Sequence, residues 1–223
     1  MSHGDLPPTT STSPGMRMGL AYRLLWLFFR SLLLVGWRMR VIGLEHLPPR
    51  GPYIMTPNHP SEVDPVVLST ALPFRPTYLA GRELERYPVI FAMLRKFDPV
   101  FVRRGLSDVG AIKACLERLR RGEILVVFPE GGVVQQANPG TLHPGAAFLA
   151  VRAQVPIVPV VLRGLSKMWP LGARWPRPSR VLIRFGAPIW PPASNSQGAR
   201  DLTETIGRAL GRLLAEDPAA APP

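Results

Sequence analysis

Short apolar runs alternate with amphipathic stretches along most of the chain, and the two patterns predict different elements. The runs lie at 41–44, 53–55, 77–80, 99–102, 124–127, 157–162 and 181–185, and each has the length of a strand. The stretches with helical spacing lie at 65–72, 87–96, 108–121, 145–154 and 198–214. This alternation predicts an α/β domain over 41–214, with a mixed central sheet flanked by helices. Residues 164–179 are expected to form a loop.

The N-terminal part of the chain changes character before this domain begins. Residues 1–15 contain Ser, Thr, Pro and Gly and almost no large apolar group, so we expect them to be disordered, as we do the tail at 215–223. Residues 16–40 are dominated by large apolar side chains and predict a helical, membrane-associated segment. Arg23 and Arg30 lie about 20° apart around such a helix, because seven residues make almost two turns.

These two arginines decide how the segment can meet a membrane. A spanning helix would carry both into the bilayer, at about 2.5–3.5 kcal/mol each near its centre. A helix lying in the interface avoids this cost, because its arginines meet lipid phosphates while its apolar side chains enter the acyl region. The side chains expected to enter are Leu24, Leu25, Trp26, Phe28, Phe29 and the leucines at 32–34. We therefore expect an amphipathic interfacial helix, and the alternative is a core helix with its arginines turned outward.

Composition narrows the classes of partner. The 223 residues are 46% apolar, enough for one domain with a full core, and 27 Lys and Arg against 15 acidic residues give a formal charge of +12. Such a charge favours nucleic acid, an anionic membrane face or phosphorylated substrates. The basic residues are scattered and no nucleic-acid-binding signature accompanies them, which argues against nucleic acid as the partner. One cysteine and four histidines without metal spacing indicate neither a disulfide nor a metal site.

Polar groups gather at three places where predicted strands end, and ligands of α/β sheets bind beyond the carboxyl ends of strands. The three are His59 with Asp64, Arg103 with Arg104, and Glu130 with Gly131. His59 and Asp64 would lie about 140° apart on one straight helix, so they can meet only if the chain bends, and Pro60 favours a bend. A histidine held by a carboxylate is a general base at physiological pH. The alternative is that Asp64 caps a helix and His59 is an ordinary loop residue.

Four blocks of the sequence resemble the motifs of the glycerolipid acyltransferases, the family of 1-acylglycerol-3-phosphate acyltransferase. They lie at 58–64, 101–105, 128–131 and 155–160, and the first contains the family's His-x4-Asp pattern. The resemblance extends over about 40–185. It implies an enzyme of phospholipid biosynthesis that moves a fatty acyl group from acyl-CoA or acyl-carrier protein to the hydroxyl of a lysophospholipid, first of all 1-acylglycerol-3-phosphate.

The resemblance also implies roles for single residues. His59 would be the general base and Asp64 would orient it, without an acyl-enzyme intermediate. Arg104 would bind phosphate, and Glu130 with Gly131 would contact the acceptor. We expect the adjacent Arg103 to bind the substrate together with Arg104. No metal or cofactor is implied beyond the acyl donor, and the expected place is the cytoplasmic face of a membrane with anionic lipids.

The sequence departs from the family pattern around the acceptor. Gly132 and Val133 stand where the family usually has Thr and Arg, His143 and Pro144 replace a common lysine, and Arg103 stands where Asp or Asn is frequent. These departures keep two alternatives open. One is an acyltransferase acting on a different hydroxylated lipid, and the other is a non-catalytic, membrane-binding relative.

Overall fold

The computed structural model describes residues 20–82, 85, 98–103, 108–134, 141–192 and 196–216. Its helices are α1 (Leu20–Gly36), the short 3-10 helix η2 (Leu44–His46), α2 (Asp64–Ala71), α4 (Val109–Arg120), α5 (Gly145–Ala153), α6 (Leu165–Met168) and α7 (Ser196–Ala215). Its strands are β1 (Arg40–Ile42), β2 (Tyr53–Pro57), β3 (Thr77–Gly81), β4 (Val100–Val102), β5 (Ile124–Val126), β6 (Ile157–Arg163) and β7 (Leu182–Phe185). The predicted disorder of 1–15, the predicted helix at 87–96 and nearly all of the predicted tail lie outside the described residues.

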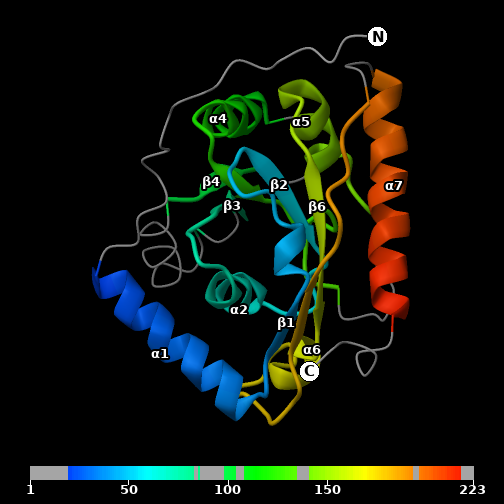
Figure 1. Cartoon of the computed structure of the whole chain (residues 1–223). Coiled ribbons are helices and arrows are strands. Elements are labelled where there is room, and N and C mark those ends of the chain that lie inside the picture. Colours follow the sequence, from blue (N-terminus) through cyan, green and yellow to red (C-terminus); the bar gives the residue numbers. More distant parts are fainter. Residues whose placement is uncertain are drawn as a thin grey trace.

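The strands form one mixed sheet in the order β1-β7-β6-β2-β5-β3-β4. All neighbouring pairs are parallel except β6 and β7, which are antiparallel. The predicted α/β class with a mixed central sheet is therefore confirmed (Figure 1). Because β2, β5, β3 and β4 run in one direction, the segments that follow them all leave the sheet at the same edge.

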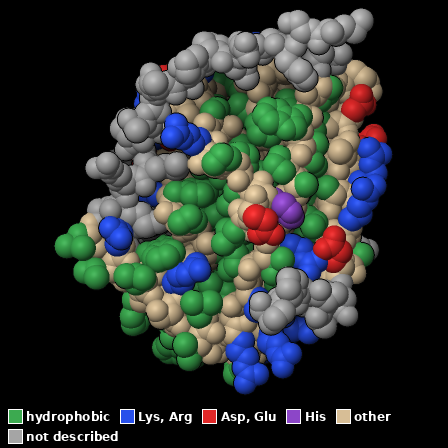
Figure 2. All heavy atoms as spheres, viewed as in Figure 1, with side chains coloured by type: hydrophobic (Ala, Val, Ile, Leu, Met, Phe, Trp, Pro, Cys, Tyr) green, Lys and Arg blue, Asp and Glu red, His purple; other side chains and the backbone are tan. Residues whose placement is uncertain are grey.

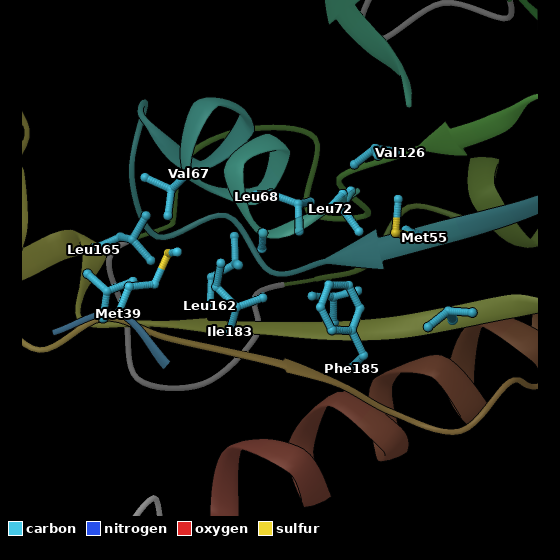
Figure 3. Packing of buried hydrophobic residues seen from close by; sticks show 14 of the residues in the cluster. Met39, Met55, Val67, Leu68, Leu72, Val126, Leu162, Leu165, Ile183 and Phe185 are labelled. Atoms are coloured by element: carbon cyan, nitrogen blue, oxygen red, sulfur yellow. The ribbon is translucent and has the colours of Figure 1, made fainter. Parts of the chain in front are cut away.

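Two apolar layers cover the two faces of the sheet. Successive residues of a strand point to opposite faces, and in β2 Tyr53 and Met55 join one buried cluster while Ile54 joins the other. The first cluster includes apolar side chains from α2 and from Leu72, which directly follows α2. Figure 3 shows Val67, Leu68 and Leu72 packed towards the sheet. The second includes side chains of α4, α5 and α7. This double cover explains why β2 is buried along its whole length.

Helix α1 packs against α2, and this contact corrects the orientation expected for the N-terminal segment. The Arg30 Nη1 donates a hydrogen bond to the Thr70 carbonyl at 2.8 Å, and Trp26 Nε1 donates to the Ser69 carbonyl at 3.2 Å. The last carbonyls of a helix lack partners within it and attract cations, which explains why Arg30 turns towards the end of α2. The prediction that both arginines face lipid phosphates is therefore wrong for Arg30.

The apolar side chains of α1 divide between protein and surface. Leu33 is buried in the core, whereas Leu24 and Phe28 are 60% and 62% exposed. The expectation that the apolar side chains as a group enter a bilayer is thus wrong for Leu33 and for the half-buried Trp26. Among the described residues, no helix has the length and apolar character needed to cross a membrane.

Candidate active site

The turn that carries His59 is fixed by the residue before it. Asn58 is nearly buried, and its side-chain amide donates to the Leu162 carbonyl at 3.2 Å. The Leu162 backbone N–H donates back to Asn58 Oδ1 at 2.7 Å. The side chain thereby continues the pairing of β2 with β6 beyond the end of the strand. The sequence pattern gave no sign of this role.

The structure brings His59 and Asp64 together. Asp64 is the first residue of α2 and is fully buried, whereas His59 lies in the preceding turn, outside the helix. The His59 Nδ1 and Asp64 Oδ2 are 2.8 Å apart, and the Ser61 backbone N–H donates to the same oxygen at 3.0 Å. With Nδ1–H donating to the carboxylate, Nε2 of His59 is the nitrogen that can take a proton.

The Asp64 carboxylate is buried beside the His59 ring. Burial raises the pKa of Asp64 above its ordinary value, and the hydrogen bonds from His59 and Ser61 oppose that rise. None of the described residues donates a hydrogen bond to Asp64 Oδ1. A buried carboxylate is stabilised by a positive charge beside it.

Phe128 covers one face of the histidine. Its ring stacks on the His59 ring with centroids 4.0 Å apart and an angle of 24° between the planes. Phe128 follows β5, the strand that pairs with β2, so strand pairing alone brings it to the site. The stack fixes the imidazole plane and leaves only a small part of the ring exposed. Glu130 and Gly131, which follow shortly after it, were expected at the site, but nothing in the pattern indicated this contact.

Glu130 and Gly131 lie beside the same turn. Glu130 Oε2 accepts the His59 backbone N–H at 3.1 Å, and the Val134 N–H donates to the His59 carbonyl at 2.8 Å. Gly131 has a φ of +70°, and a Cβ there would come within 2.9 Å of the His143 ring. The segment from 129 to 134 therefore holds the backbone of His59 from both sides. An interaction of Glu130 with an acceptor remains a prediction.

Arg103, one of the two predicted phosphate-binding arginines, stands apart from this centre. Arg103 is exposed at the end of β4, and its backbone N–H donates to Asp108 Oδ2 at 3.1 Å. Asp108 also caps α4 by accepting the Ala111 N–H, and these backbone hydrogen bonds lower the pKa of Asp108. Three strand spacings separate β4 from β2, which is about 14 Å. Arg104 lies outside the described residues.

The hydroxyl nearest the dyad in sequence and the single thiol are not arranged as nucleophiles. Ser61 Oγ is buried and donates to the Trp169 carbonyl at 3.0 Å. Cys115 is buried behind the sheet, and burial raises its pKa to about 12. Within the described ranges, no three His, Cys, Asp or Glu side chains are placed to hold a metal ion. The arrangement can supply a general base, and a general base of this kind can activate an external hydroxyl.

The sequence matches a family model and several known proteins. A family model described as "Acyltransferase" matches residues 38–163, which include the dyad and Glu130 and end with β6. A probable 1-acyl-sn-glycerol-3-phosphate acyltransferase of Mycoplasma genitalium is 32% identical over 165 residues, which are 70% of this chain and 59% of that protein. A protein of the same description from Mycoplasma pneumoniae is 27% identical over 91% of this chain and 80% of its own length.

Two further relatives extend the comparison. A lyso-ornithine lipid O-acyltransferase of Pseudomonas aeruginosa is 30% identical over 61% of this chain and 52% of its own length. The crystal structure of a 1-acyl-sn-glycerophosphate (LPA) acyltransferase from Thermotoga maritima superposes with a TM-score of 0.67, at 24% identity, over 86% of this chain and 78% of that one. The chain thus shares that fold, and it spans less than two thirds of the length of the Mycoplasma genitalium relative.

Proposed function

This chain belongs to the acyltransferase family, and from that premise we propose that it transfers a fatty acyl group from acyl-CoA or acyl-carrier protein to the hydroxyl of a lysophospholipid. The observation that carries the proposal is the hydrogen bond between His59 Nδ1 and the fully buried Asp64. It gives the protein one general base, at the sheet edge where ligands of such folds bind.

The reaction can be written with these two residues alone. Nε2 of neutral His59 takes the proton of the acceptor hydroxyl while its oxygen attacks the thioester carbonyl. Asp64 stabilises the imidazolium that forms. The new C–O bond remains when the C–S bond breaks, and the imidazolium returns its proton to the departing thiolate. The His59 backbone N–H is engaged by Glu130, so the donors that stabilise the oxyanion lie elsewhere.

The acceptor that we propose first is 1-acylglycerol-3-phosphate, in phospholipid biosynthesis. The descriptions of the Mycoplasma relatives support it, and so does the position of Arg103 at the same sheet edge as His59. A different hydroxylated lipid is the second candidate, because Gly132, Val133 and Pro144 replace polar or cationic side chains of the family pattern. The lyso-ornithine lipid relative favours the same alternative.

We also propose that the protein works on the cytoplasmic surface of a membrane that contains anionic lipids. The exposed apolar side chains of α1 and the charge of +12 support this location. Acceptors with long acyl chains reside in the bilayer, whereas acyl-CoA and acyl-carrier protein are soluble in the cytoplasm. An enzyme that joins them has to work at the boundary.

Thiol release from a long-chain acyl donor tests the proposal. Purified full-length protein is given acyl-CoA or acyl-carrier protein with lysophosphatidate, lysophosphatidylcholine, lyso-ornithine lipid or no acceptor. We expect release that requires lysophosphatidate, and release with another acceptor alone would instead establish the second candidate. Lipid binding without release from either donor would contradict the proposal and identify a non-catalytic relative.

A further inference from the structure

The segment 170–180, which joins α6 to β7, presents an unusual surface; we call it the basic loop. Leu171 and Trp175 are 63% and 76% exposed. Its three arginines, Arg174, Arg177 and Arg180, are exposed, as is Lys167 in α6, and no acidic residue occurs from 164 to 180. Figure 2 shows Lys and Arg gathered at the lower end of the view, where Figure 1 has α6 and the segment leading to β7.

The backbone of the basic loop is held in place. The Ala173 N–H donates to the Pro170 carbonyl at 3.0 Å, and the Arg177 N–H donates to the Met168 carbonyl at 2.7 Å. Single exposed apolar side chains are common on protein surfaces. Here two of them are carried by an ordered loop among cations, so a partner would bind them without first ordering the backbone.

The basic loop adjoins the exposed apolar side of α1. Trp37 directly follows α1, and its Nε1 donates to the Arg177 carbonyl at 2.8 Å. The Val181 N–H donates to the Trp37 carbonyl at 3.1 Å. The end of α1 and the basic loop therefore lie side by side, as Figure 1 also shows at the lower end of the molecule. Both carry exposed apolar side chains.

The basic loop carries more cations than α1 does. Arg30 of α1 is engaged with the end of α2, and Arg23 is the other cation of that helix. The basic loop with Lys167 supplies four cations and no acidic residue. Apolar attraction to a bilayer should therefore come mainly from α1, whereas attraction to anionic headgroups should come mainly from the basic loop.

We infer that the basic loop is a second membrane contact, in which Trp175 and Leu171 enter the interface of an anionic bilayer and the arginines bind lipid phosphates. Tryptophan favours this interface because its ring is apolar and its N–H is polar. The inference rests on the proposed function, since the acceptor resides in the bilayer. An acidic carrier protein is a less fitting partner, because the basic loop adjoins the end of α1, and both carry exposed apolar side chains.

The contact would also set the position of the dyad above the membrane. Trp169 immediately precedes the basic loop, and its carbonyl accepts the Ser61 hydroxyl at 3.0 Å. Ser61 in turn donates its backbone N–H to Asp64. Two hydrogen bonds thus join the root of the basic loop to the carboxylate of the site, so a loop seated on lipid places the site at a fixed height.

Vesicle binding by charge variants of the basic loop tests the inference. We compare the wild type with R174Q/R177Q/R180Q and with R174K/R177K/R180K on phosphatidylcholine vesicles, with and without about one third phosphatidylglycerol. Each lost cation should weaken binding to the anionic vesicles about fivefold, so the Gln variant should lose roughly a hundredfold. The Lys variant should stay near the wild type, and all three should bind neutral vesicles equally.

Quenching of tryptophan fluorescence by brominated lipid gives a second readout. Trp190 is a matched control because it is also exposed, at 71%, but lies far from the basic loop. It follows Ile189, which pairs with Ile157 at the start of β6, whereas α6 follows the end of β6. Quenching should fall in Trp175→Phe and should be unchanged in Trp190→Phe. Equal quenching in the two variants would overturn the insertion of Trp175.

Turnover of lysophosphatidate in neutral detergent micelles separates this inference from the proposed function. The Gln variant should keep wild-type turnover in micelles and lose it on anionic vesicles. Anionic vesicle binding equal to the wild type would overturn the inference, as would a selective loss of binding to acyl-carrier protein. Equal losses in micelles and on vesicles would also overturn it, because the loop would then act on the site itself. Loop-dependent vesicle binding without turnover by the wild type would support the contact and refute the proposed function.

Discussion

Asp64 is the residue whose surroundings explain the site. It is fully buried at the start of α2, it accepts two hydrogen bonds on one oxygen, and its other oxygen has no donor among the described residues. A buried negative charge is costly unless a positive charge lies beside it. The cost is reduced when His59 takes a proton, and this links the fold to the proposed chemistry.

Replacing the carboxylate with an amide should separate catalysis from structure. Asp64→Asn keeps the shape and one acceptor oxygen but removes the charge that stabilises the imidazolium. We expect kcat for acyl transfer to fall by about 10²- to 10⁴-fold with little change in KM for the acceptor. Steady-state thiol release measures both constants. A variant with wild-type kcat would show that the carboxylate has no part in the reaction.

The same variant should change how stability depends on pH. Burial raises the pKa of Asp64 above its ordinary value of 3.8, so the folded protein binds this proton more tightly than the unfolded chain does. Between 3.8 and the raised pKa, the free energy of unfolding due to Asp64 therefore falls as pH rises. Asn does not titrate, so the stability of Asp64→Asn relative to the wild type should increase through this window and level off above it. Urea unfolding from about pH 3.5 to about pH 7.5 measures the difference, and a constant difference would contradict the assignment.

Gly131 offers a test of the backbone around His59. With φ at +70° and the His143 ring close by, Gly131→Ala should destabilise the protein by about 1–2 kcal/mol. Gly211→Ala is the matched control, because Gly211 lies inside α7 and a Cβ there meets nothing within 4 Å. That change should stabilise by about 0.5–1 kcal/mol. Chemical denaturation measures both, and equal effects would argue against strain at Gly131.

The residues of the site differ in how far the sequence could reveal them. His59 and Asp64 are five positions apart, so local geometry and Pro60 were enough to predict that they could meet. Phe128 and the hydrogen bond from His59 to Glu130 depend on the pairing of β2 with β5. No local pattern encodes strand order, so these contacts required the structure.

Among the elements, α1 packs on α2 with one side and exposes apolar side chains on the other. Its apolar side chains extend almost all round, so the pattern alone could not tell which side packs on protein. The arginines were expected to mark the outer side together, yet Arg30 is the residue that attaches α1 to α2. The sequence also placed a loop at 164–179, whereas residues 165–168 form α6, a single turn too short to show a periodic pattern.

The attachment of α1 can be tested by comparing its two arginines. Arg30→Met should lower the free energy of unfolding by about 1.5–3 kcal/mol, because the Thr70 carbonyl loses a charged donor. Arg23→Met, on the same helix at an exposed position, should change it by no more than about 0.5 kcal/mol. Urea unfolding compares the pair. Similar values for the two variants would mean that the Arg30 hydrogen bond does not hold α1 in place.

For the whole molecule, the order of the strands decides what the site contains. Parallel strands β2, β5, β3 and β4 end at one edge, which brings Glu130 to His59 and places Arg103 farther along the same edge. The α/β class followed from alternating patterns. The antiparallel β7 between β1 and β6 did not, because short apolar runs carry no sign of direction.

The charge of the whole molecule should appear in the salt dependence of activity. Raising salt from about 50 mM to about 500 mM screens the attraction between a protein of charge +12 and an anionic bilayer. We expect the apparent KM for an acceptor in anionic vesicles to rise about tenfold or more, while kcat changes less than about twofold. Neutral micelles provide the control. An equal salt effect on vesicles and in micelles would mean that salt acts on the acyl transfer itself and not on membrane binding.

The most direct measurement is the acceptor-dependent release of thiol from a long-chain acyl-CoA by His59→Gln and by the wild type. Gln keeps a side chain that can hydrogen-bond to Asp64 but cannot take a proton. The wild type should release thiol only when lysophosphatidate is present, and His59→Gln, with an unchanged thermal unfolding profile, should be at least about 10²-fold slower. Wild-type rates in a folded His59→Gln variant would contradict the account, because the proton of the acceptor hydroxyl would then be taken by another group.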